Sequence, residues 1–244
     1  MTQEYIDKIE LADAYEFVKK IDDKSVDLVF IDPPYQIDAT KAGGKSSLAR
    51  SIQGMNNELE ENEICGSIDI KILDDFMRIM KKPNIYIWCN HKQIPMYLSY
   101  FVDKQGCSFD IIVVHKNNAT PLFCNKYLTD KEYCLYFRKG AYCQPQSYEK
   151  ARTVYSKNIN IKDKNLFMHP TSKWVDVCQN LIENSTRPNE IVLDCFMGGG
   201  TTAIACKELG RHFIGCEINP KWHKVANDRV NKIDANGQTS FLLR

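Results

Sequence analysis

Several features are missing from this chain of 244 residues, and each absence removes a class of protein. No run of about 18 apolar residues occurs, which argues against a membrane-spanning helix. The first ten residues, MTQEYIDKIE, are acidic and lack the apolar core of a secretory signal peptide. We therefore expect a cytoplasmic protein with no membrane partner.

Paired metal ligands are also missing. The ten cysteines are scattered, no C-x-x-C pair occurs, and the five histidines are dispersed. A structural zinc site needs cysteine or histidine ligands paired on tight turns, and a disulfide framework is typical of small secreted chains. The sequence predicts reduced, mostly buried thiols and no metal site.

The net charge is only +1, so a nucleic-acid partner does not follow from the total. The charge is unevenly distributed, however: residues 138–173 carry a net charge of +6, and residues 1–35 carry −5. This asymmetry is typical of an enzyme with one phosphate-binding face, and equally of a solvated lysine-rich loop. The candidate DNA contacts in the basic stretch are Lys150, Arg152 and Lys157.

Apolar β-type runs alternate with helical periodicities along the chain. Strands are expected at 5–11, 26–31, 84–90, 109–116, 132–138, 190–196 and 212–218. Helices are expected at 12–21, 67–81, 91–105, 171–184, 200–209 and after Pro220. The alternation predicts a single α/β domain over residues 1–244 with a mostly parallel sheet. No long helix separates 109–116 from 132–138, which predicts one antiparallel edge strand.

Two long segments have no regular pattern. Residues 36–64 are polar, and residues 139–168 are basic with interspersed aromatic side chains. Loops of this length in a compact domain are usually functional or disordered.

A glycine-rich turn lies near the C-terminus, in IVLDCFMGGGTTAIACKELG at 191–210. Gly198, Gly200 and Ala203 match the dinucleotide fingerprint, and Glu217 ends the next strand, where a carboxylate binds ribose hydroxyls. Asp194, directly before the glycines, would repel a pyrophosphate but attract the ammonium and sulfonium groups of S-adenosylmethionine. A ligand-free tight turn and a nicotinamide-dependent dehydrogenase remain alternatives.

The tetrapeptide DPPY at 32–35 follows an apolar strand, which places Asp32 where α/β sheets bind ligands. The Asp32 carboxylate and the Pro33 carbonyl are suited to accept the hydrogens of an exocyclic amine, so that its lone pair faces a methyl donor. Pro33 and Pro34 fix the backbone, and Tyr35 offers a ring for stacking on a flipped base. A simple proline turn is the alternative.

These motifs together resemble the DNA amino methyltransferases, in particular the β group, where the catalytic motif precedes the cofactor motif. Residues 32–35 are similar to the family's catalytic motif, and residues 194–202 to its D-x-F-x-G-x-G-T-T motif. The segment HPTSK at 169–173 resembles the family's H-P-T-x-K, which closes over the methionine end of the cofactor. The resemblance implies that the cofactor is bound by Asp13, Asp32, His169, Thr171, Lys173, Asp194, Phe196, Gly198, Gly200, Thr201, Thr202 and Glu217.

The resemblance also implies a Rossmann-like S-adenosylmethionine-dependent methyltransferase fold that is circularly permuted, so that the chain supplies the usual first two strands last. It further implies that residues 139–168 recognise the target, with 36–64 as a DNA-contacting loop. The expected reaction is methylation of adenine N6 in duplex DNA, because cytosine-N4 enzymes of the family more often have Ser in place of Asp32. The partners expected are double-stranded DNA and, from the family, a homodimer; a cognate restriction enzyme is left open.

Three other functions remain as alternatives to DNA adenine methylation. N4-cytosine methylation uses the same chemistry. Methylation of RNA or protein glutamine usually accompanies N-P-P-aromatic motifs and the unpermuted order. A catalytically inactive DNA-binding module would not need both motifs intact.

Overall fold

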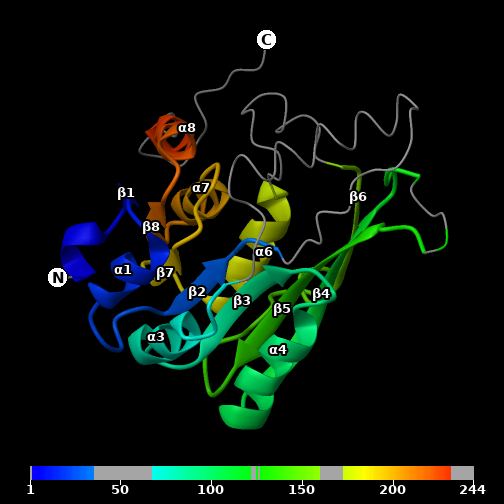
Figure 1. The fold of residues 1–244 in the computed structure, drawn as a ribbon, viewed down its shortest axis with the longest axis horizontal. Coiled ribbons are helices and arrows are strands. Elements are labelled where there is room, and N and C mark those ends of the chain that lie inside the picture. Colours follow the sequence, from blue (N-terminus) through cyan, green and yellow to red (C-terminus); the bar gives the residue numbers. More distant parts are fainter. Residues whose placement is uncertain (1, 36–67, 122–124, 126, 160–172, 232–244) are drawn as a thin grey trace.

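The computed structural model describes residues 2–35, 68–121, 125, 127–159 and 173–231. Its strands form one eight-stranded sheet in the order β1-β8-β7-β2-β3-β5-β4-β6 (Figure 1). The strands are β1 (Lys8–Leu11), β2 (Leu28–Ile31), β3 (Asn84–Cys89), β4 (Ser108–Lys116), β5 (Lys131–Arg138), β6 (Val154–Lys157), β7 (Ile191–Asp194) and β8 (His212–Glu217). The predicted mostly parallel α/β sheet is confirmed.

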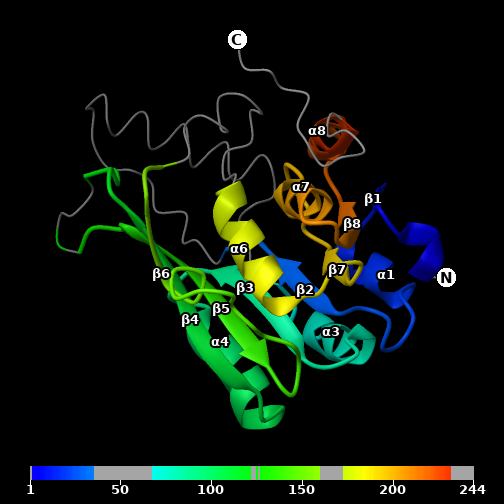
Figure 2. The same ribbon diagram turned by 180° about the vertical axis from the view of Figure 1, so that it is seen from behind.

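Helices cover both faces of the sheet, as Figures 1 and 2 show from opposite sides. One face packs against α1 (Ala14–Lys19), α3 (Ile72–Ile79) and α4 (Ile94–Leu98). The other face packs against α6 (Val175–Ser185), α7 (Thr201–Glu208) and α8 (Pro220–Asn231). The described residues also include two short helices, the 3₁₀-helix η1 (Thr2–Tyr5) and the π-helix η2 (Ser99–Lys104).

The two-sided cover explains the composition of the central strands. All four residues of β2 (LVFI) and all six of β3 (NIYIWC) are buried. Parallel strands covered on both faces are nearly continuous apolar runs, whereas half-exposed strands alternate. The central strands were therefore the easiest to predict.

The first strand of the chain, β1, pairs in parallel with the last strand, β8, and β7 joins β8 to β2. The chain thus enters the sheet at one edge and returns to that edge at its end, which confirms the predicted circular permutation. Because β1, β8, β7, β2 and β3 are all parallel, their carboxyl ends meet at one edge of the sheet.

Two predictions about the far half of the sheet need correction. The antiparallel strand β5 exists, but it lies inside the sheet, between β3 and β4, and β6 forms the edge. The strand β6 falls within 139–168, which the sequence suggested was irregular, and it pairs in parallel with β4. Its sequence VYSK has no fully buried residue, so it carries no apolar run that would have revealed a strand.

Helix boundaries also differ from the prediction. The helix expected at 91–105 is divided into α4 and η2, and the helix expected from 171 begins at Val175. The proposed 36–64 loop lies outside the described residues.

Candidate active site

The glycine turn connects β7 to α7 at the carboxyl edge of the sheet. Gly198 and Gly200 both have positive φ, at 51° and 81°, where an L side chain is strained. A Cβ on Gly200 would lie 3.1 Å from the Ala226 Cα of α8. Both glycines therefore supply the left-handed backbone that the turn needs, and Gly200 also allows the turn to approach α8 closely.

The carboxylate of Asp194 is fixed at the start of this turn. Its Oδ1 accepts a hydrogen bond from the Phe196 amide at 3.0 Å, and its Oδ2 accepts one from the Thr202 hydroxyl at 2.6 Å. Burial raises the pKa of Asp194 to about 7, although the two hydrogen bonds act in the opposite direction. A buried acid of this kind gains from a cation placed beside it.

Glu217, at the end of β8, supports the same turn. Its Oε2 accepts from the Gly198 amide at 2.7 Å and its Oε1 from the Asn219 amide at 2.9 Å, while burial raises its pKa. Leu11 and Ile218, on either side of this acid, are each about half exposed. A buried carboxylate beside exposed apolar side chains suits a ribose that carries an aromatic base.

Asp13 lies at the adjacent strand end but has a structural task. It is the N-cap of α1, where its Oδ1 accepts from the Tyr15 and Glu16 amides at 2.9 and 3.1 Å. Capping of this kind explains the residue without any ligand. Its contact with the cofactor stays a prediction.

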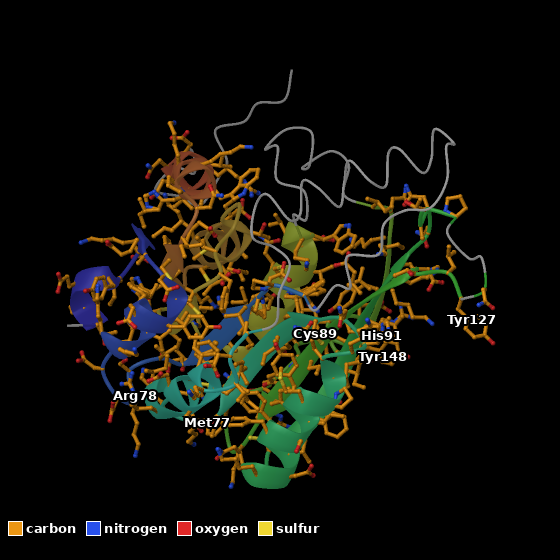
Figure 3. The ribbon with its side chains drawn as sticks, viewed as in Figure 1. Met77, Arg78, Cys89, His91, Tyr127 and Tyr148 are labelled. Carbon is orange, nitrogen blue, oxygen red and sulfur yellow. The ribbon has the colours of Figure 1, made fainter. Side chains whose placement is uncertain are left out.

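The DPPY segment follows β2, the strand next to β7. The Tyr35 hydroxyl donates to Asp32 Oδ1 at 3.0 Å, and the fully buried Gln93 donates through Nε2 to the Pro34 carbonyl at 3.2 Å. These contacts hold the acid and the turn in one orientation. In Figure 3 the neighbouring β3 end, marked by Cys89, lies in the middle of the molecule.

Lys173 reaches Asp32 from the segment before α6. Its Nζ lies 2.7 Å from Asp32 Oδ2 and 3.5 Å from Glu132 Oε2, and its side chain is 7% exposed. The ammonium also lies over the rings of Tyr35 and Trp88, at 5.2 and 5.3 Å from their centroids. Lys173 was predicted with the cofactor-binding residues; its partners here include Asp32 of the DPPY segment.

The pKa shifts in this cluster have opposing causes. Burial alone would lower the pKa of Lys173, but the two carboxylates outweigh it and raise the pKa. Burial raises the pKa of Asp32 more than Lys173 lowers it, and the charge of Glu132 adds to the rise. Two acids share one base, so Lys173 keeps its positive charge in this buried cluster.

Comparison with known proteins shows the family to which the chain belongs. The sequence profile of the N6/N4 DNA methylases matches residues 26–228, which include both motifs. The chain belongs to this DNA methylase family. It is thus a DNA amino methyltransferase, and S-adenosylmethionine is its cofactor.

Relatives cover almost the whole methylase. The type II methyltransferase M1.MboII of Moraxella bovis is 26% identical over 95% of this chain and 99% of its own. M2.LlaDCHI of Lactococcus lactis is 28% identical over 95% of this chain and 93% of its own. The crystal structure of the M1.HpyAVI–SAM complex has a TM-score of 0.65 and 26% identity, and covers 92% of this chain and 98% of that one.

The remaining predicted residues of the methylase are placed as follows. Phe196 and Thr202 contact Asp194, and Thr201 is buried at the start of α7. His169 and Thr171 lie outside the described residues. Within the part that is described, no helix is long and apolar enough to span a membrane, and no cluster of His, Cys, Asp and Glu is suited to a metal.

The three predicted DNA contacts form ion pairs. Lys150 pairs with Glu183 and Lys157 with Asp176, both on α6. Arg152 pairs with Glu149 at 2.9 Å, and both side chains are largely exposed. Such exposed pairs are weak, so they do not prevent phosphate contacts. DNA binding by these residues stays a prediction.

Sequence reasoning missed several residues that build the site. Gln93 and Glu132 contact the catalytic segment and Lys173, and the buried Arg229 of α8 donates to the Gly199 carbonyl. A Cβ on Gly215 of β8 would lie 2.1 Å from the Met197 methyl group, so the glycine leaves room for the Met197 side chain of the glycine turn. None of these has a sequence motif.

Proposed function

We propose that the methylase transfers a methyl group to the exocyclic N6 of adenine in duplex DNA. The target base is flipped out, and transfer is direct, without a covalent enzyme intermediate. One observation carries the proposal: Asp32 follows β2 and Asp194 ends β7, and these two strands pair with Val29 opposite Leu193. The amine-binding motif and the cofactor motif thus lie side by side at the carboxyl edge.

Asp32 and the backbone of the DPPY segment orient the amine. An aromatic exocyclic amine is a poor nucleophile because its lone pair is delocalised into the ring. The Asp32 carboxylate and the Pro33 carbonyl accept the two amine hydrogens and favour a pyramidal nitrogen. Gln93 donates a hydrogen bond to the carbonyl of the next residue, Pro34, and so limits the turn to one orientation.

Tyr35 has two tasks in this proposal. Its hydroxyl keeps Asp32 Oδ1 in place, at 3.0 Å, while its partly exposed ring is available to stack on the flipped base. Stacking and orientation bring the amine to the donor in a reactive geometry.

The cofactor is held by the glycine turn and the two acids that support it. S-adenosylmethionine supplies a methyl group made electrophilic by its sulfonium charge. Asp194 faces the cationic end, and Glu217 binds the ribose hydroxyls beside Leu11 and Ile218. The residues present fit this ligand because a buried acid with a raised pKa lies where its positive charge is expected.

Adenine is the proposed target because the first residue of the catalytic tetrapeptide is Asp32, where cytosine-N4 enzymes of the family more often have Ser. Mass spectrometry of digested DNA from a host that expresses the gene tests this assignment. N6-methyladenine is expected. N4-methylcytosine would overturn the base assignment and leave the amino-methylation mechanism intact.

The DNA partner is proposed to contact the basic segment 139–168 and the 36–64 loop. A homodimer would extend this surface, as the family resemblance favours, and a cognate restriction enzyme would make the protein the protective half of a pair. The proposed location is the bacterial or phage-infected cytoplasm, where the DNA is.

The Asp32→Ala variant tests the mechanism. It leaves the glycine turn intact, so binding of S-adenosylmethionine and DNA should persist. Turnover, followed by tritium transfer to unmethylated DNA, should fall by about 10²–10³ or more, because a positioned electrostatic group is removed. Near-normal turnover would refute the assigned role of Asp32.

A further inference from the structure

Glu132 contacts the catalytic cluster from a strand that has no motif. Because β5 runs antiparallel to β3, it begins at the edge where the parallel strands end. Glu132 is the second residue of β5, and its Oε2 is a buried oxygen without a hydrogen-bond partner among the described residues. The ammonium of Lys173 lies 3.5 Å from this oxygen, and the Lys116 Nζ of β4 lies 3.7 Å from Oε1.

Lys173 thus lies between two carboxylates, closer to Asp32 than to Glu132. The two distances differ by less than 1 Å, so a small change in the lysine side chain exchanges one partner for the other. The rings of Tyr35 and Trp88 line this short path and keep the ammonium within the cluster.

Such an exchange favours the proposed reaction. In the structure, Tyr35 donates to Asp32 Oδ1 and Lys173 lies against Oδ2, so a hydrogen of the amine competes with these partners for the carboxylate oxygens. A lysine released from Asp32 without another anion would leave an uncompensated buried charge, which is strongly unfavourable. Glu132 is the anion at hand.

We propose that Glu132 is a positioning residue of methyl transfer, which accepts Lys173 as Asp32 turns to the amine of the target base. This inference rests on the proposed role of Asp32. After transfer the amine nitrogen is cationic; one N–H bond breaks, its electron pair stays on nitrogen, and the proton forms an O–H bond on Asp32. Lys173 then pairs with Glu132, so no buried charge is left alone.

The charges around Asp32 agree with this exchange. Burial and the negative charge of Glu132 both raise the pKa of Asp32, which favours uptake of the proton. Among the described residues, the titratable groups that interact electrostatically with Asp32 are Tyr35, Cys89, Tyr97, Glu132, Cys134, Lys173, Cys178 and Asp194.

The Glu132→Gln variant tests the proposal. It keeps the shape of the side chain and removes its charge, so Lys173 should remain on Asp32. We expect the single-turnover rate to fall roughly 10- to 100-fold, the cost of a misplaced reacting group, while affinity for S-adenosylmethionine and DNA stays within about twofold. The acid limb of the pH–rate profile should move to lower pH, because one negative charge that raises the pKa of Asp32 is gone.

Matched variants separate positioning from a structural effect. Lys116→Gln removes the other cation beside Glu132 and should leave the rate and the pH profile near wild type. Glu132→Asp retains the charge, so it should restore the wild-type acid limb with part of the rate. In a Lys173→Met background, Glu132→Gln should add no further loss, because Glu132 acts through the lysine.

Other results would overturn the inference. A wild-type rate and pH profile in Glu132→Gln would do so, as would an equal loss in Lys116→Gln or an additive loss in the double variant. If Asp32→Ala keeps its turnover, the proposed function fails first; if Asp32→Ala is inactive but Glu132→Gln is unchanged, only the role of Glu132 fails. Thermal unfolding checks that each variant is folded. If Glu132→Gln does not fold, the rate and pH profile of Glu132→Asp test the inference in its place.

Discussion

Cofactor binding should depend on pH through Asp194. In the free protein the pKa of this buried acid is about 7, whereas a bound cation stabilises the ionised form and lowers it. The acid binds the cofactor as a carboxylate, so affinity is fully present above pH 7 and is lost as the pH falls below it. About nine tenths of Asp194 is ionised at pH 8 and about one tenth at pH 6, which predicts roughly tenfold weaker binding at pH 6, or about 1.4 kcal/mol.

Calorimetric titration with S-adenosylmethionine at pH 6, 7 and 8 measures this dependence. Asp194→Asn is the matched control, because it keeps the shape and cannot ionise; its remaining pH dependence belongs to the ligand itself. At pH 6, titrations in buffers of different ionisation enthalpy should also detect nearly one proton released per cofactor bound to the wild type. Parallel pH curves for wild type and Asp194→Asn would refute the reasoning.

The same pKa has a consequence for folding with the opposite sign. Between the unfolded value of 3.8 and about 7, the folded state holds a proton that the unfolded state has lost. Without cofactor, the contribution of Asp194 to stability is therefore greatest at low pH and falls as the pH rises through this window. Chemical unfolding at pH 5 and pH 8 should show wild type losing stability relative to Asp194→Asn as the pH rises.

Three further predictions concern the rest of the site. Glu217→Ala should weaken S-adenosylmethionine binding by about 1–3 kcal/mol in calorimetry, since a charged hydrogen-bond acceptor is removed; unchanged affinity would mean that the ribose lies elsewhere. Gly200→Ala should lower the free energy of unfolding by about 1–2 kcal/mol or more, measured with denaturant, because φ is 81° and a Cβ would press on α8; a wild-type midpoint would contradict the close approach. Joint replacement of Lys150, Arg152 and Lys157 should lower the slope of log K for DNA against log salt by roughly 0.9 for each phosphate that is no longer neutralised. An unchanged slope would exclude these residues as phosphate contacts.

The sequence alone determined the central strands, both motifs and the permuted order of the sheet. These features are local: β2 and β3 are apolar because both of their faces are covered, and the turn after Asp194 needs glycine because its backbone has positive φ. Local backbone geometry and burial restrict which residue types can stand at a position, so the sequence indicates them directly. The order of the two motifs, together with the resemblance to the β group, predicted the circular permutation of the sheet.

Only the tertiary structure decided what surrounds Asp32. Lys173 and Glu132 meet Asp32 from 141 and 100 residues further along the chain, and Gln93 reaches the Pro34 carbonyl from the start of α4. These contacts depend on β5 running antiparallel inside the sheet and on the packing of α6, which are set by long-range pairing. A single lysine, glutamate or glutamine leaves no pattern in the local sequence, because the local backbone conformation does not depend on it. Such a residue is needed only because a charged partner, distant in the sequence, is buried beside it.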